Sequence, residues 1–367
     1  MSGGPPPAPT SRGRIEGLDV LRGLAVLLVI MRHAWPHTFA GAGIVGVVVF
    51  FALSGYLITA LLVRDISSFG RVRYGRFYLH RAIRLLPALL LLLAVFALIE
   101  GLTDLGGARD SVLRTVIVAI TYTTNIPGFD HGSDLLGHLW TLATEEQFYL
   151  VWPLVLVLGA RFRRMRLAVL IAGVAIVGVL ALTLLRAAPH YGMIYPWPTS
   201  WAIAMVIGAA AQLGKTRLRR ALPEGSWRTT AAASAALVLI LVISTLPERD
   251  GGWWPYLVTG PAVALATVAL VFFLVQWRTL PTRALHPLLG LGTVSYAAYL
   301  WNWPIVGWLE AGGAGGWTPV LSIVLTVLAA WLSWVLVERP ASRLRPRADA
   351  FLRARAERRE TRVDVAG

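Results

Sequence analysis

The sequence repeats apolar runs of roughly 17 to 25 residues, and this feature constrains the fold more than any other. A run of that length, coiled as an α-helix, matches the ~30 Å hydrocarbon core of a bilayer. Only 14% of the residues are charged, whereas about 25% are charged in soluble globular proteins. We therefore expect an all-α polytopic membrane protein embedded in a lipid bilayer. The apolar segments span residues 17–36, 41–63, 84–100, 111–126, 138–160, 166–186, 198–213, 230–246, 256–276, 288–309 and 319–337.

Basic residues recur in alternate connections between these segments, which is the positive-inside pattern of a multi-pass inner (plasma) membrane protein. The pattern places both termini in the cytoplasm, so the number of crossings must be even and the eleven segments cannot all cross. The shortest segment, 111–126, ends in threonine and asparagine. Irregular backbone within a membrane is tolerated only around a protein-buried cavity, so we expect this segment to be re-entrant or buried near the active site. About ten transmembrane helices remain. The basic connections are 64–84, 161–166, 214–228 and 278–283.

The chain divides into three predicted parts. Residues 1–13 are rich in proline, glycine and serine, which predicts a disordered tail. Residues 14–340 are expected to form the membrane domain, and residues 341–367 a basic cytoplasmic tail. We expect neither a cleavable signal peptide nor an appended soluble domain.

The net charge of +15 and the absence of cysteine narrow the possible functions. Most of the positive charge lies in the connections and tails, which favours contact with the membrane surface and disfavours nucleic acid as a partner. Without cysteine the chain has no disulfide, no thiolate metal site and no cysteinyl thioester intermediate. We expect no metal site.

Arg22 and His33 lie in the first apolar segment, with ten residues between them. Eleven helical positions amount to about three turns and roughly 16 Å, so the two side chains share one face. Asp19 lies about one turn before Arg22, on nearly the same face. Titratable side chains inside such a segment are costly and by default mark a functional path. The alternative is that Arg22 anchors the helix at the lipid headgroups while His33 reaches the far surface.

Six unusual strings follow one another along the chain, at residues 18–33, 46–58, 76–87, 140–150, 294–304 and 337–340. In their order and spacing they resemble acyltransferase family 3, a family of integral membrane O-acyltransferases, and the resemblance runs over residues 15–345. It implies transfer of an acyl group, expected to be acetyl, from cytoplasmic acyl-CoA to a hydroxyl of a sugar, glycan or glycosylated metabolite. It also implies that acyl-CoA is a co-substrate and that no cofactor is tightly bound.

The motifs of that family fall on this chain residue by residue, with three departures. The motif of an arginine, ten residues and a histidine falls on Arg22 and His33, and the Glu-Glu-Gln-Phe-Tyr string falls on 145–149. The departures are His80 where arginine is common, Thr141 for serine, and Asn302 for the usual histidine. If that histidine moves protons in relatives, this chain manages without it.

Acyl transfer to an alcohol needs a base for the hydroxyl and donors for the developing oxyanion. His33 is the natural base, because an imidazole ordinarily has a pKa near 6.5. A carboxylate that orients the imidazole would raise its basicity, and Glu145 is the first candidate, with Glu146 second. The alternative is that these two residues are interfacial capping carboxylates.

The phosphates of CoA need cations. Arg81 and Arg84 lie three residues apart at the start of the third apolar segment and suit phosphate binding on one helical face. We add Arg22 for the pantetheine or pyrophosphate, and Asp19 because it shares that face. The alternative for Arg81 and Arg84 is simple anchoring at the cytoplasmic surface.

The remaining candidates have two interpretations each. Ser54 is either an acyl-accepting nucleophile or, as we favour, part of a Ser-Gly pair that lets two helices approach closely. Tyr296, Tyr299 and Trp301 either stack on a sugar or form an interfacial aromatic belt. His138 either faces the acceptor or is a loop histidine.

Two other functions stay open at the level of sequence. A multispan transporter or flippase of a glycan or lipid would share the span count and the intramembrane charges, although it more often shows internal repeats, which we do not find. A non-catalytic scaffold is the other, and the joint presence of Arg22, His33 and Glu145 disfavours it.

Overall fold

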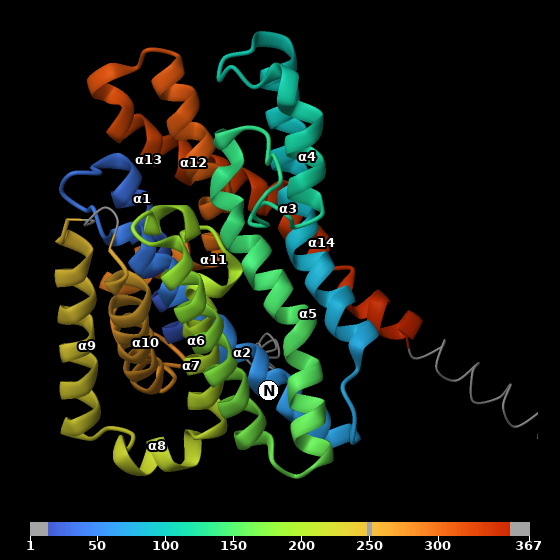
Figure 1. The fold of residues 1–367 in the computed structure, drawn as a ribbon, viewed down its shortest axis with the longest axis vertical. Coiled ribbons are helices and arrows are strands. Elements are labelled where there is room, and N and C mark those ends of the chain that lie inside the picture. Colours follow the sequence, from blue (N-terminus) through green and yellow to red (C-terminus); the bar gives the residue numbers. More distant parts are fainter. Residues whose placement is uncertain (1–13, 248–251, 353–367) are drawn as a thin grey trace, which may run out of the picture.

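The computed structural model describes residues 14–247 and 252–352, and these residues form a bundle of helices without any β-strand (Figure 1). Two predictions, the disordered tail at 1–13 and the last part of the basic tail at 353–367, lie outside the described residues. The helices are α1 (Glu16–Ala34), α2 (Ala42–Phe69), α3 (Tyr74–Thr103), α4 (Val112–Ile120), α5 (Trp140–Arg161), α6 (Met165–Ala187), α7 (Pro198–Leu213), α8 (Lys215–Ala221), α9 (Trp227–Thr245), α10 (Gly260–Leu274), α11 (His286–Thr293), α12 (Ser295–Ala311), α13 (Thr318–Ser333) and α14 (Arg339–Ser342).

The expected all-α membrane protein is confirmed. Within the described ranges, six helical segments are by themselves long and apolar enough to cross a membrane. The expected count of ten stays a prediction, because α7 and α12 are short and α1 and α5 carry several charged residues. The six are Ala42–Phe69, Tyr74–Thr103, Met165–Ala187, Trp227–Thr245, Pro255–Leu274 and Gly315–Leu352.

Segment 111–126 folds as the nine-residue helix α4 and a turn. Nine residues of α-helix are about 14 Å long, which is too short to cross the hydrocarbon core. In Figure 1, α4 runs beside α3 and the chain then returns toward the upper end of α5. A helix this short is compatible with the expected re-entrant segment, which stays a prediction. α4 exposes Leu113 and Ile117, so it lies at the surface of the bundle and is not buried within it.

Two segment boundaries differ from the sequence-based prediction. Residues 64–84 were expected to form a basic loop, but α2 continues to Phe69 and α3 begins at Tyr74. Arg64 therefore lies on α2, whereas Arg76, Arg81 and Arg84 lie on α3. The short connection between the two helices carries Arg71 and Arg73. The segment at 288–309 is broken at Val294 into α11 and α12, where Gly292 lies directly against the backbone of α1.

The centre of the bundle is closely packed, whereas its outer surface exposes apolar side chains. α1 contacts α2, α11 and α12 and buries most of its length. α2 and α7 touch at Gly55 and Gly208, where an added Cβ would collide with the backbone of the other helix. Helices α6, α9 and α13 instead expose side chains such as Leu170, Val238 and Val324. An apolar exterior of this kind is the surface that lipid covers.

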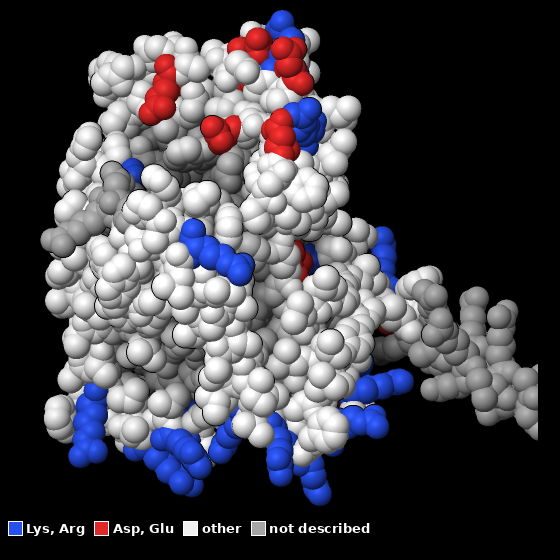
Figure 2. Space-filling view, viewed as in Figure 1, with Lys and Arg blue, Asp and Glu red and all other residues white. Residues whose placement is uncertain are grey.

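Charge separates the two ends of the bundle. Figure 2 shows a row of lysine and arginine at the lower end, without red groups among them, and most of the visible aspartate and glutamate at the upper end, where some basic groups lie beside them. The surface between the two ends is mostly white, with a few basic groups. The lower end includes α8 and the α5–α6 connection (Figure 1). The bands match the interior and two faces of a membrane.

Candidate active site

A cavity of about 130 Å³, which we call the inner cavity, lies between α1, α2, α3, α5 and α12. These helices bring together residues that are far apart in the sequence and that were assigned separate roles from the sequence. Those that line the cavity are Arg22, Ser54, Arg81, Arg84, Glu145, Tyr296 and Tyr299.

Two carboxylates hold Arg81 within the inner cavity. Arg81 Nε donates to Glu146 Oε1 at 2.6 Å, and Arg81 Nη2 lies 3.9 Å from Glu145 Oε2. The guanidinium also lies 3.4 Å from the ring centre of Tyr149. Ser54 Oγ donates to Glu145 Oε1 at 2.7 Å. Arg81 is therefore paired with protein groups, and removing it would leave two partly buried carboxylates without this cation.

Arg84 differs from Arg81 although it lies one turn along the same helix. Its side chain lines the inner cavity, and in the described part of the chain it has neither a hydrogen bond nor an ion pair. Arg22 is intermediate, since its Nη1 donates to Asp19 Oδ1 at 2.8 Å. Asp19 also accepts from Arg14 Nε at 2.6 Å. Arg84 is thus the guanidinium best placed to take an anionic ligand.

A second cavity of about 510 Å³, the basic cleft, adjoins the inner cavity at Arg81 and Arg84. It opens between α2 and α3 at the lower end of the bundle. Six arginines and a histidine line it, together with the carboxylate of Asp65. The basic lining residues are Arg64, Arg73, Arg76, His80, Arg81, Arg84 and Arg345.

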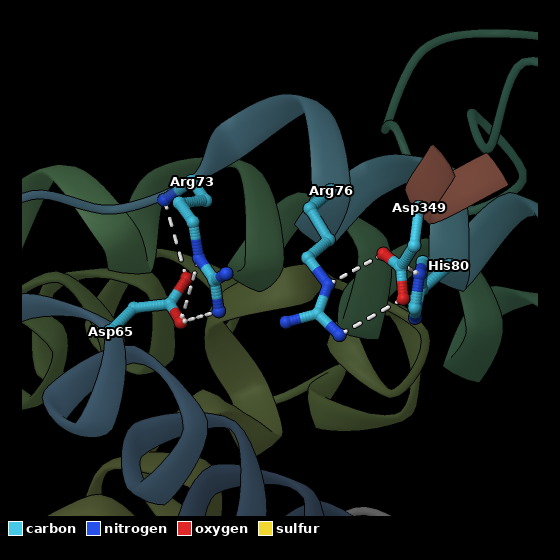
Figure 3. Close-up of polar contacts among 5 residues, drawn as sticks. All are labelled: Asp65, Arg73, Arg76, His80 and Asp349. Carbon is cyan, nitrogen blue, oxygen red and sulfur yellow. Dashed lines mark hydrogen bonds and ion pairs between the residues drawn. The ribbon is translucent and has the colours of Figure 1, made fainter. Parts of the chain in front are cut away.

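Two aspartates pair with part of this basic lining (Figure 3). Asp65 accepts from Arg73, with the Nη2–Oδ1 distance at 2.7 Å. Asp349, from the helical segment 345–352, accepts from Arg76 Nε at 2.7 Å and lies 2.9 Å from His80 Nε2. His80, the departure from the family pattern, therefore adds to the basic lining and contacts the same carboxylate as Arg76.

His33 lies at the other end of α1 and lines a third cavity, the outer cavity, of about 550 Å³. Its Nδ1 is 2.5 Å from Asn302 Oδ1, and Asn302 Nδ2 donates to Thr326 Oγ1 at 3.1 Å. Asn302 is fully buried. In this arrangement Nδ1 carries the proton, so Nε2 is the nitrogen that can accept one.

The expected pairing of Glu145 with His33 is wrong for this structure. Glu145 accepts from Ser54 and lies beside Arg81, at the level of Arg22. His33 is eleven residues further along α1, or roughly 16 Å, so the two side chains sit at different depths of the bundle. The side chain that orients the imidazole is Asn302.

A buried polar layer lies between the inner and outer cavities. Tyr299 Oη donates to the carbonyl of His138 at 3.0 Å and accepts from Thr141 Oγ1 at 2.7 Å. His138 Nε2 is 3.1 Å from the carbonyl of Leu300. His138 is buried and belongs to this layer. Its position therefore fits neither a loop histidine nor a residue that faces the acceptor from the outer side.

The aromatic residues of α12 have different surroundings. Tyr296 Oη donates to the carbonyl of Leu85 at 3.1 Å, and Tyr299 is tied into the polar layer. Trp301 is buried in an apolar cluster. Trp303 lies in the string 294–304 but was not among the predicted site residues. It is 37% exposed and lines the outer cavity. Its ring centre lies 4.8 Å from that of His33.

Ser54 and Gly55, which we considered as one packing motif, have separate positions. Gly55 is the residue that contacts α7, at the backbone of Met205. Ser54 instead lines the inner cavity and donates to Glu145.

Sequence reasoning missed the outer cavity, which gathers Arg32, Asp134, Trp303 and Glu310 around His33. One feature of the sequence could have pointed to this cavity. Glu100 is a lone carboxylate at the end of an apolar segment, and it proves to be fully buried beneath this cavity.

Comparisons with known proteins agree with the sequence motifs. The family model described as "Acyltransferase domain" matches residues 15–338. A protein of Bacillus subtilis (strain 168) named "Putative peptidoglycan O-acetyltransferase YrhL" is 30% identical over 359 residues, which cover 89% of this chain and 54% of that protein. "Peptidoglycan O-acetyltransferase OatA" of Listeria monocytogenes serovar 1/2a is 27% identical over 355 residues, covering 90% of this chain and 56% of that protein. The chain spans about half the length of these relatives, and no solved structure matches it.

Proposed function

The chain belongs to the acyltransferase domain family, and from this premise we propose that it is a membrane O-acyltransferase that moves an acetyl group from acetyl-CoA to a hydroxyl of a glycan. Two relatives are named as peptidoglycan O-acetyltransferases, which favours a cell-wall glycan as the acceptor. We propose further that the basic end of the bundle faces the cytoplasm, where CoA is found.

The basic cleft is the site we propose for the phosphates of CoA. Its arginines offer several guanidinium groups, which bind phosphate through paired, charge-assisted hydrogen bonds. Arg84 supports this assignment most strongly, because it lines both the cleft and the inner cavity and, within the described ranges, forms neither a hydrogen bond nor an ion pair, although Glu338 is near enough to attract it. A phosphate bound there leaves the pantetheine arm directed into the inner cavity.

The thioester is proposed to reach His33 along the face that α1 and α12 share. Arg22 and His33 mark the two ends of this face, roughly 16 Å apart. The polar layer of His138, Thr141 and Tyr299 lies on the route, so the extended pantetheine arm or the acyl group has to pass it.

The chemical step is a direct transfer. His33 Nε2 takes the proton of the acceptor hydroxyl while the hydroxyl oxygen attacks the carbonyl carbon of the thioester. An ester C–O bond forms, the C–S bond breaks, and CoA leaves as a thiolate that receives the proton from the imidazolium. Asn302 acts through His33 by holding its Nδ1–H, so it is a positioning residue.

The observation that carries the proposal is the placement of an oriented histidine at one end of α1 and an unpaired arginine beside the other end. The test is acetyl transfer from labelled acetyl-CoA by protein reconstituted in nanodiscs. We expect His33→Ala to lower kcat by about 10²- to 10⁴-fold, the usual cost of losing a general base. His190→Ala, which changes an exposed histidine outside the cavities, is the matched control. Near-normal turnover by correctly inserted His33→Ala protein would overturn the assignment.

A further inference from the structure

We propose that the outer cavity is the acceptor site and that it selects an uncharged sugar ring, with Trp303 as the stacking surface beside His33. This inference rests on the proposed function and adds the substrate class to it. None of Arg32, Asp134, Trp303 or Glu310 was assigned a role by the sequence motifs.

The outer cavity has the size and the position of a binding site. Its volume of about 550 Å³ lies within the range of small-molecule pockets. The ends of α1 and α12 form one wall. The other wall comes from the two connections that flank the short helix α4, through residues such as Gly106 and Ser133.

The two connections are held in place by buried hydrogen bonds. Glu100 accepts from the backbone N–H groups of Gly106 and Ala108, both at 3.1 Å, and from Trp308 Nε1 at 2.8 Å. The hydroxyl of Thr115 accepts from the N–H of Ser133 at 2.8 Å. The cavity is therefore formed before any ligand arrives, which reduces the entropy that binding must overcome.

Trp303 is fixed at its edge and is partly exposed. Its Nε1 donates to the carbonyl of Asp134 at 2.7 Å, while 37% of the residue stays exposed. An exposed indole face packs against the apolar C–H face of a pyranose. Because the His33 ring lies 4.8 Å away, a sugar stacked there would present a hydroxyl close to the proposed base.

The charge of the lining sets the class of sugar. Two carboxylates, Asp134 and Glu310, and one guanidinium, Arg32, line the cavity with two serine hydroxyls. Carboxylates accept hydrogen bonds from sugar hydroxyls and repel anionic groups. The site thus favours an uncharged ring that carries free hydroxyls over an anionic one.

The absence of native cysteine allows a direct binding test. Ser111 lines the cavity, and Ser111→Cys changes one atom. Gly192→Cys, in the outer part of the bundle where an added side chain meets open space, is the control. We measure maleimide labelling of both variants with and without a soluble, uncharged oligosaccharide of N-acetylglucosamine, and in parallel we measure acetyl transfer to this glycan by the cysteine-free protein.

We expect the glycan to slow labelling of Ser111→Cys at least fivefold and to leave Gly192→Cys unchanged. Adding Trp303→Leu should remove the protection and raise the acceptor KM at least tenfold, with the acetyl-CoA KM unchanged, while Trp303→Phe should restore part of both. Turnover without protection would overturn the acceptor site but not the proposed function. Protection without turnover would support the site and overturn the proposed function. Neither protection nor turnover would overturn both.

Discussion

The basic cleft and the outer cavity are nearly equal in volume, at about 510 and 550 Å³, yet their linings are opposite in chemistry. The cleft is lined by arginines with one carboxylate, whereas the outer cavity is lined by two carboxylates, one arginine, an indole, serines and glycines. Size therefore does not distinguish the two sites. Their charge does, and it matches a phosphate-rich donor at one end and an uncharged sugar at the other.

One helix face connects the two sites. Tyr296, Tyr299, Trp303, Gly307 and Glu310 follow one another along α12 at intervals of three or four residues. The first two line the inner cavity and the last three line the outer cavity. Substitutions in the basic cleft should therefore change the binding of acetyl-CoA only, and substitutions in the outer cavity should change the binding of the glycan only.

Arg84→Gln gives the largest expected effect in this comparison. The variant should raise the acetyl-CoA KM by roughly 10- to 150-fold, because a hydrogen bond to a charged group contributes about 1.5–3 kcal/mol. The acceptor KM should not change. Steady-state kinetics in nanodiscs, with each substrate varied in turn, measures both values.

Arg217→Gln is the control for Arg84→Gln, because Arg217 lies at the same end of the bundle but outside the cleft. A rise in the acceptor KM on Arg84→Gln would remove the distinction between the two ends.

Asn302→Leu tests whether the outer end depends on the orientation of His33. The change removes the partner of Nδ1 and should lower kcat by roughly 5- to 30-fold, consistent with about 1–2 kcal/mol for a hydrogen bond in a buried site. Asn302→His again offers a nitrogen that can accept the Nδ1 proton in a hydrogen bond and should restore at least half of the lost rate. Equal losses in Asn302→Leu and Asn302→His would show that Asn302 matters for packing alone.

Ser54→Ala separates direct transfer from an acyl-enzyme route. Direct transfer requires only the hydrogen bond to Glu145, so we expect no more than about a tenfold fall in kcat. An acyl-enzyme route would instead give a loss as large as that of His33→Ala. It would also leave an acetyl mass on the wild-type protein when acetyl-CoA is added without acceptor, which intact-protein mass spectrometry detects.

Asp349→Asn should have the smallest effect, and it should lower the acetyl-CoA KM, whereas Arg84→Gln raises it. The carboxylate offsets the charge of Arg76 and contacts His80 beside the cleft, so its removal should lower the acetyl-CoA KM, by up to about fivefold. Glu224→Gln, which changes an exposed carboxylate paired with Arg219, controls for net charge. A higher KM in Asp349→Asn would mean that this contact organises the cleft and does not compete with the ligand.

The sequence predicted the helices well because they depend on regular apolar patterns. Each apolar segment contains a helix, and helical spacing places Arg22 on the face that meets Arg84 and Glu145. The pairing of His33 was not predictable in the same way. It depends on how deep α5 and α12 sit relative to α1, and a shift of one turn moves a side chain by about 5 Å.

The outer cavity was missed for a different reason. Part of its lining comes from connections, where Gly106 and Ser133 follow no periodic pattern. Their positions are set by hydrogen bonds to Glu100 and Thr115, which are distant contacts that a sequence pattern does not encode. The contact between Asp349 and Arg76 joins residues 273 positions apart, so it could not be predicted from a local sequence pattern either.

The central claim is that donor and acceptor bind at opposite ends of the protein, and sidedness in proteoliposomes tests it most directly. Protein of uniform orientation is reconstituted, with acetyl-CoA supplied only on the side of the basic cleft and glycan strands only on the side of the outer cavity. We predict acetylated glycan in this arrangement and none when acetyl-CoA and glycan are both confined to either single side. Acetylation that occurs only when both substrates share one side would contradict the account.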